Sequence, residues 1–407
     1  MINKNKHIPQ GYKDSPLGII PKEWEVKRLG EVCDYVDYRG KSPNKSSNGI
    51  FLVTAKNIRN GFIDYETSKE YIPSDEYEET MRRGKVQVGD VLITTEAPLG
   101  HVAQIDNPNI ALAQRVIKYR GKKEILNTFL KYYLMSEQFQ TILIANATGS
   151  TALGIKGSRL HQLPIIIPAL KEQEQICIIL QLWDTAIEKQ SELIEKLTLR
   201  KRALMQQLLT GKKRLPGFSE DWKEIKLGEI FIERNETNLS DLPLLSITGD
   251  KGVIYQSESD KRDISNDDKS KYKRICPNDI GYNTMRMWQG RSALSQLEGI
   301  VSPAYTIVTP TEEIDVRFMA MLIQQPRVVY DFWTHSQGLV SDTLNCKYPD
   351  FSQVKVCIPM KEEQKAIADM LYGFDKEIEL ANEKLANFQF QKRGLMQQLL
   401  TGKKRIK

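Results

Sequence analysis

The sequence predicts an α+β protein in which two mixed α/β globular domains are joined by two long antiparallel coiled-coil helices with pseudo-two-fold symmetry. Three observations predict this class: a block of about 50 residues occurs twice, each copy has an apolar heptad pattern, and an unlike block precedes each copy. The 407 residues therefore divide into two unlike globular blocks, 1–162 and 215–353, and two repeated blocks, 163–214 and 354–407.

The repeat is the strongest signal in the chain. Residues 204–214 and 395–405 both read LMQQLLTGKKR, and the match extends backwards without a gap until 163–214 aligns with 354–405. A weaker match pairs Trp24 with Trp222, and the Leu-Gly-Glu of 29–31 with that of 227–229. A spacing this long exceeds the unit of a solenoid. It indicates a duplicated module made of one domain and one helix.

Each repeated block is predicted to form a long helix. Apolar residues recur in alternating steps of four and three, which is the heptad period of a coiled-coil seam. Gly211 and Gly402 follow the last apolar positions, where glycine commonly ends a helix. The predicted seam comprises Ile176, Leu180, Trp183, Ile187, Ile194 and Leu197 in the first copy, and Ile367, Leu371, Phe374, Ile378, Leu385 and Phe388 in the second.

Pairing the two predicted helices is the simplest way to bury both seams. A helix over 172–209 would be about 57 Å long at ~1.5 Å per residue. Because a globular block connects the two helices, an antiparallel pair is the easiest to close. The alternative is that each helix packs only on its own domain.

The two globular blocks are predicted to contain short strands followed by helices. Strand-like runs occupy 49–55, 90–95 and 115–119 in the first block, and 243–248, 252–256 and 304–308 in the second. Helical stretches follow at 124–146 and 313–333. This order favours an α/β or α+β domain in each block.

Composition and motifs exclude several classes of function. No apolar run reaches the ~18 residues of a membrane span, and the first residues resemble no secretory signal, so we expect a cytoplasmic protein. Five scattered cysteines and four histidines show no metal-ligand spacing, and no phosphate-binding glycine loop is present. Net charge is +6 overall, yet block 215–353 carries −6. Charge alone therefore does not decide whether the partner is a nucleic acid.

The combined pattern resembles the specificity subunit of type I restriction–modification systems. Glu-Gln-x-x-Ile opens each heptad helix, at 172–176 and 363–367, and each helix ends in LMQQLLTGKKR. Stretches 54–64, 89–105 and 149–168 resemble one target recognition domain of that family. Stretches 279–291, 301–308 and 338–359 resemble a second.

This resemblance implies a noncatalytic protein that reads a bipartite target in double-stranded DNA. Each recognition domain would read one half-site, and the paired helices would fix the spacer between them. The chain would dock two methyltransferase subunits and the restriction and translocase subunits. It would bind no cofactor itself, since S-adenosylmethionine, ATP and magnesium belong to the partner subunits.

Two loops hold the candidate DNA-binding residues, because loop side chains of these types contact bases and phosphates. Lys56, Asn57 and Arg59 lie near an Asn-Gly turn, where a solvated turn is the alternative. Arg39, Lys41 and Lys45 extend this basic region, which is more often a solvated loop than a contact surface. In the second block the candidates are Tyr282, Asn283, Arg286 and Arg291.

Two other classes of protein stay open at this stage. A stand-alone methyltransferase or nuclease is disfavoured, because neither a cofactor loop nor a metal-carboxylate group is visible. A coiled-coil scaffold would explain the helices but not the two unlike domains. The lysines and arginines of 212–214 and 403–405 are candidates for contacts with phosphates or a partner, or are plain helix ends. The sequence does not reveal the bases read or the spacer length.

Overall fold

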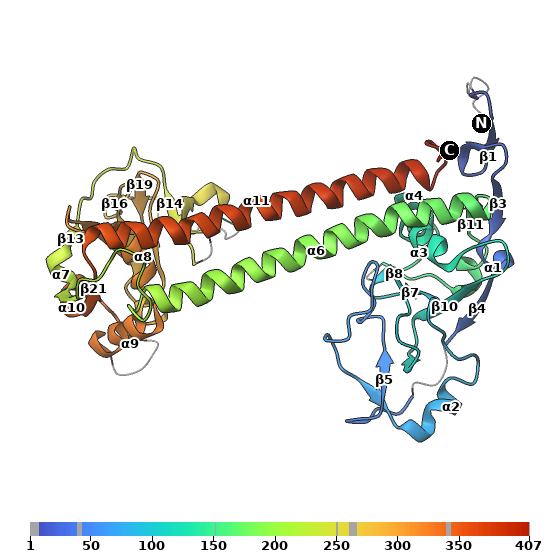
Figure 1. Cartoon of the computed structure of the whole chain (residues 1–407), viewed down its shortest axis with the longest axis horizontal. Coiled ribbons are helices and arrows are strands. Elements are labelled where there is room, and N and C mark those ends of the chain that lie inside the picture. The colour runs from blue at the N-terminus through green and yellow to red at the C-terminus, as the bar shows by residue number, and fades with distance from the viewer. Residues whose placement is uncertain are drawn as a thin grey trace. The chain divides into compact units, whose positions relative to one another are not determined.

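The computed structural model describes residues 8–38, 43–150, 152–249, 251–259, 267–338 and 343–406. The chain divides into two compact units: unit 1 comprises 1–191 with 384–407, and unit 2 comprises 192–383. Both units contain antiparallel sheets, short helices and parts of two long helices, which are green and red in Figure 1. The mixed α+β class predicted from the sequence is confirmed.

Unit 1 is built around a four-stranded antiparallel sheet of order β4-β10-β7-β8. A smaller sheet pairs β5 with β6 and β9, while β11 pairs with β3 next to the long helix. The strands are β1 Tyr12–Ser15, β2 Gly18–Pro21, β3 Glu25–Arg28, β4 Cys33–Asp37, β5 Ile50–Val53, β6 Tyr71–Ile72, β7 Val91–Thr95, β8 Leu99–Gln104, β9 Ile110–Leu112, β10 Val116–Gly121 and β11 Pro164–Ile167. The short helices are α1 Leu29–Val32, α2 Tyr77–Thr80, α3 Asn127–Met135, α4 Glu137–Ala145 and α5 Gly157–Leu160.

Unit 2 repeats this plan with a sheet of order β13-β20-β17-β18. Its strands are β12 Lys223–Lys226, β13 Phe231–Arg234, β14 Leu245–Ile247, β15 Val253–Tyr255, β16 Lys273–Ile275, β17 Ile280–Asn283, β18 Ser292–Leu294, β19 Gly299–Val301, β20 Tyr305–Pro310 and β21 Lys355–Ile358. Its short helices are α7 Leu227–Ile230, α8 Val316–Leu322, α9 Pro326–His335 and α10 Tyr348–Gln353, with a 3₁₀ turn, η3, at Met287–Gln289.

A buried aspartate begins an inner strand of each main sheet. In unit 1, Asp90 precedes β7, and Arg120 of β10 donates to it from Nε at 2.6 Å and Nη2 at 2.7 Å. In unit 2, Asp279 precedes β17, but the guanidinium comes from one strand further away on the same side: Arg234 of β13 donates from Nε at 2.7 Å. Thr309, at the place of Arg120, donates its hydroxyl to Asp279 at 2.8 Å. The carboxylate is kept while its arginine has moved to a different strand.

The two long helices are α6, Leu170–Leu208, and α11, Lys361–Leu399. All seam positions named above are buried or half-buried, whereas most residues between them are exposed. After each helix a glycine takes a left-handed φ, +69° at Gly211 and +72° at Gly402. Glycine adopts this conformation at no steric cost, which explains why both helices stop here. Among the helices of the described residues, none is long and apolar enough to cross a membrane.

Each unit contains the first part of one long helix and the last part of the other, running antiparallel. In unit 1, Trp183 of α6 meets Phe388 of α11 with ring centroids 5.6 Å apart, and Lys392 pairs with Asp184. In unit 2, Arg200 lies over the Phe374 ring, and an ion pair joins Lys201 to Asp375.

Both interpretations of helix packing describe part of this arrangement. The start of each helix enters the core of its own domain, Ile176 and Leu180 in unit 1 and Ile367 and Leu371 in unit 2. The end of the other helix completes the same core, with Leu399 and Leu400 in unit 1 and Leu208 and Leu209 in unit 2.

Candidate nucleic-acid interface

The loop between β17 and β18 and the turn between β14 and β15 surround a polar hollow of about 460 Å³ in unit 2. The loop brings together three of the candidates, Asn283, Arg286 and Arg291, and adds Gln289. From the turn come Thr248 and Gly249, among others. Cationic and amide side chains around one hollow are the donor set that reads base edges and phosphates.

The loop is held rigidly by its own hydrogen bonds. Asn283 accepts from the Met285 amide at 3.0 Å through Oδ1, and Trp288 donates from Nε1 to the Met285 carbonyl at 3.0 Å. Met287 is fully buried, and Gly290 turns the chain with a φ of +73°. Because these contacts fix the backbone, the remaining polar side chains project from a defined frame.

Three of these side chains are unengaged. Arg286, Gln289 and Arg291 are exposed, and no ion pair or side-chain hydrogen bond involves them within the described ranges. By contrast, the arginines that brace the sheet are paired: Arg234 with Asp279, and Arg274 with Glu236 and Glu298. Unpaired donors exposed around a hollow are available to a ligand.

Tyr282 is not part of this surface. The residue has no exposed area, and its ring stacks on Phe351 with centroids 5.1 Å apart. Burial raises the pKa of its hydroxyl well above the usual value. The prediction that Tyr282 contacts DNA is therefore wrong for this structure. Side chains alternate along a strand, so Tyr282 shares the inward face of Ile280. This two-residue period in the sequence could have indicated that Tyr282 is buried.

Asn57, the central candidate of unit 1, is also buried and fully engaged. Its Oδ1 accepts from the backbone and hydroxyl of Thr54 at 2.9 Å and 2.8 Å, and its Nδ2 donates to the carbonyls of Asp64 and Thr67. The predicted DNA contact by Asn57 is therefore wrong as well. It closes the loop from the inside.

The neighbours of Asn57 are accessible. Lys56 is exposed, and Arg59 keeps 40% of its side chain exposed beside Asp64 at 3.4 Å. Hydrogen bonds from Thr67 to Asp64, first the hydroxyl and then the amide, lower the pKa of Asp64 to about 2. Lys56 and Arg59 remain predictions. Of the extended basic region, Arg39 and Lys41 lie outside the described residues, and Lys45 pairs with Glu70 at 2.8 Å.

The corresponding loop of unit 1 has different chemistry. Between β7 and β8 it carries Glu96 followed by Ala97 and Pro98, and the carboxylate of Glu96 lies 3.5 Å from Arg115. Where unit 2 exposes two arginines that no described residue pairs, unit 1 presents an acid-base pair. The two sheets are alike, but the loops they carry are not.

The arginines at the ends of the repeats, Arg214 and Arg405, are engaged within the protein. Arg405 donates to Glu172 from Nε at 2.7 Å and Nη2 at 3.1 Å, and Trp24 donates to the same carboxylate at 2.8 Å. In unit 2, Arg214 binds Glu363 in the same bidentate manner, at 2.7 Å and 2.6 Å. Both arginines clamp the start of the other repeat's helix, so neither is free for a phosphate in this structure.

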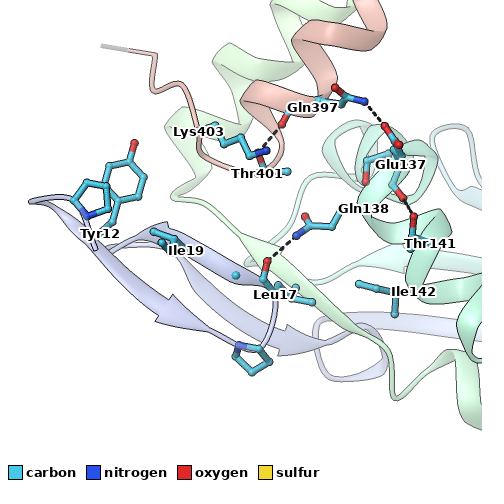
Figure 2. A pocket seen from close by; sticks show the side chains of 14 residues that line it. Tyr12, Leu17, Ile19, Glu137, Gln138, Thr141, Ile142, Gln397, Thr401 and Lys403 are labelled. Atoms are coloured by element: carbon cyan, nitrogen blue, oxygen red, sulfur yellow. Dashed lines mark hydrogen bonds between the residues drawn. The ribbon is translucent and has the colours of Figure 1, made fainter. Parts of the chain in front are cut away.

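A second hollow, of about 1170 Å³, lies in unit 1 between the β1–β2 hairpin, the start of α4 and the end of α11. Figure 2 shows Gln138 donating to the Leu17 carbonyl, a 2.8 Å bond, and Gln397 bonded to Glu137. The hairpin is tied to the end of α11 by Tyr12, whose hydroxyl donates to the Gly402 carbonyl at 3.0 Å. The lining of this second hollow is largely apolar, which does not suit a polyanion.

Comparisons with known proteins agree with this geometry. The family model of the type I restriction modification DNA specificity domain matches residues 21–199 and again 219–387. Two Methanocaldococcus jannaschii proteins are similar over nearly their whole length. The type I restriction enzyme MjaX specificity subunit is 25% identical, covering 98% of this chain and 97% of that protein, and the MjaVIII specificity subunit is 24% identical, covering 95% and 94%.

A solved structure shares the fold. The type I restriction–modification S subunit from M. genitalium aligns with a TM-score of 0.56 and 16% identity, covering 93% of this chain and 96% of that one. The doubled family match falls on both sheets and on both long helices. The chain therefore belongs to the type I restriction–modification DNA specificity family, with two copies of the specificity domain.

Proposed function

We propose that this chain selects the DNA site on which a type I restriction–modification complex acts, one half-site being read by the domain of each unit. The supporting observation is that equivalent sheets carry unlike loops: in unit 2, Arg286 and Arg291 have no partner among the described residues, while Glu96 and Arg115 are paired in unit 1. A shared frame with different reading residues suits a target whose two halves differ.

The long helices, on this proposal, set the spacing between the half-sites. Two ion pairs, Arg214–Glu363 and Arg405–Glu172, favour this role. Each ties the end of one helix to the start of the other through a bidentate arginine–carboxylate contact. Such pairs add geometric precision as well as free energy. A helix pair held in this way resists sliding along its seam.

The proposal extends to partners and cofactors. Two methyltransferase subunits and the restriction and translocase subunits would assemble on this chain in the cytoplasm. These partners would bring S-adenosylmethionine, ATP and magnesium, and this chain would bind none of them. Its own contribution is recognition, and the chemistry on DNA belongs to the assembly.

An exchange of domains tests the proposal. Residues 215–353 are replaced by the matching block of a relative with a known target, and the chimera is expressed with its methyltransferase subunits. The modified positions in the host genome are then sequenced. We expect one half of the methylated motif to change and the other half and the spacer to persist. A motif that changes in both halves, or in neither, contradicts the two-domain assignment.

Spacing is tested separately. Removing seven residues from each helix, at equivalent positions of the repeat, keeps the seam in register because seven residues restore the same face. The spacer is expected to change while both half-site sequences persist. An unchanged spacer rules out the helices as its determinant.

A further inference from the structure

Arg291 occupies a position that only a glycine opposite permits. A Cβ atom added at Gly249 would lie 2.5 Å from Nη1 of Arg291 and 3.5 Å from its Cζ. The guanidinium thus lies against the backbone of the β14–β15 turn while its own backbone belongs to the β17–β18 loop. The Asn283 amide donates to the Arg291 carbonyl at 3.1 Å, which fixes the base of the side chain.

Among the described residues, packing against Gly249 is the contact that places this guanidinium. Within the described residues no carboxylate pairs with Arg291, although the paired arginines of the same unit, Arg234 and Arg274, have theirs within 3.0 Å. A guanidinium beside a hollow, with N–H groups that no described residue pairs, matches the two acceptors, O6 and N7, of guanine in the major groove.

We infer that Arg291 is a specificity-determining residue that reads a guanine in the half-site bound by unit 2. This inference rests on the proposed function, and it names one base of the target and the residue that reads it. Arg286 is the less constrained of the two unpaired arginines, since no described side chain or backbone holds its guanidinium, and it suits a phosphate contact. Gln289 completes the hollow with an amide that has no partner among the described residues, and an amide is the group that pairs with adenine.

Gly249 provides a variant that changes no charge. The residue has no left-handed φ, so alanine fits its backbone, and the added methyl displaces only the flexible end of Arg291. Gly249→Ala therefore moves the guanidinium, while Arg291→Lys keeps the charge and removes the planar fork. Arg327→Ala is the matched control: Arg327 is exposed on α9 of the same unit, with no ion pair in the described residues, and does not line the hollow.

The experiment selects duplexes from a randomised DNA library with the full chain and each variant, and sequences what is bound. For the wild type we expect a motif with a guanine at one position of one half. Arg291→Lys and Gly249→Ala are expected to reduce the preference at that position about 10- to 100-fold, the range for one bidentate contact. The other half of the motif should persist. Arg327→Ala, a change away from the hollow, should keep the motif in both halves.

A change in the DNA gives the decisive comparison. With 7-deazaguanine at the selected position, which lacks N7 and keeps O6, the affinity of the wild type should fall, and that of Arg291→Lys should fall less. If the wild type selects a motif and both variants keep it unchanged, the inference about Arg291 is wrong and the proposed function stands. If the wild type selects no motif, the proposed function itself fails.

Discussion

Removing Arg234 tests the buried carboxylate from which β17 starts. Asp279 is 1% exposed, and the Arg234 side chain, at 20% exposed, supplies its only cationic partner among the described residues. Arg234→Ala leaves this carboxylate buried with the Thr309 hydroxyl at 2.8 Å and the Cys276 amide at 2.7 Å. Because β17 leads directly into the Asn283–Arg291 loop, the change also tests whether this ion pair supports that loop.

The expected loss follows from these contacts. Removing one partner of a fully buried ion pair costs about 3–5 kcal/mol. Two neutral donors still bind Asp279 and the arginine was partly exposed, so we expect a loss of about 2–3 kcal/mol in the free energy of unfolding of unit 2. With a urea dependence of ~2 kcal/mol/M, the midpoint falls by about 1 M.

Urea unfolding followed by tryptophan fluorescence measures this midpoint, and hydrogen exchange detected by mass spectrometry locates the loss. Amides of β17 and β20 should exchange faster, while those of β7 and β10 in unit 1 should not change. Arg327→Ala, an exposed arginine of the same unit, is the control and should change the midpoint little.

The arrangement in unit 1 supplies a rescue. There, Val36 stands at the position of Arg234 and Arg120 at that of Thr309. Adding Thr309→Arg to Arg234→Val should therefore recover more than half of the lost stability, since a guanidinium again reaches Asp279 from β20. A double variant no more stable than Arg234→Val, or a single variant as stable as the wild type, would refute the equivalence of the two carboxylate sites.

Two further predictions concern burial. Burial raises the pKa of three thiols to about 12, so at pH 8 they stay protonated, and iodoacetamide should alkylate exposed Cys357 well before them: Cys33, Cys177 and Cys346. Mass spectrometry of the native protein measures the order, and equal rates would contradict it. Phe388→Ala removes an edge-to-face contact with Trp183 in unit 1 and should cost about 1–3 kcal/mol, because Phe388 is half-buried. Phe390→Ala, at an exposed position, is the control in the same urea assay. An equal loss of unfolding free energy in the two variants would contradict the packing of Phe388 in the helix seam.

Local periodicity made the long helices predictable. The expected span 172–209 compares with Leu170–Leu208 in the structure, and the glycines expected to end the helices do take left-handed conformations. A heptad repeat states in every turn which face is buried, so few residues are needed to recognise it. The strands over 90–95 and 304–308 were likewise recovered, as β7 and β20.

Long-range partners were not predictable in the same way. Arg214 and Arg405 were recognised as repeated cations, but their acceptors lie 149 and 233 residues away. Nothing local to either arginine indicates a carboxylate on the other helix. Asn57 shows a related limit: a polar side chain in a polar loop faces inward when backbone groups need it, and the need depends on how the loop closes. Arg291 was found by type, while its placement against Gly249 required the structure.

The division of the long helices has a consequence for synthesis. Unit 1 contains 1–191 and also 384–407, so most of this domain leaves the ribosome before unit 2 but is completed after it. Until Arg405 arrives, Glu172 has Trp24 as its side-chain partner, and the core lacks Leu399 and Leu400. Unit 2 meets no such delay, because residues 192–383 are contiguous. Nascent chains halted before residue 384 should therefore carry a stable second unit. In unit 1, the apolar surface that Leu399 and Leu400 later cover should still be exposed.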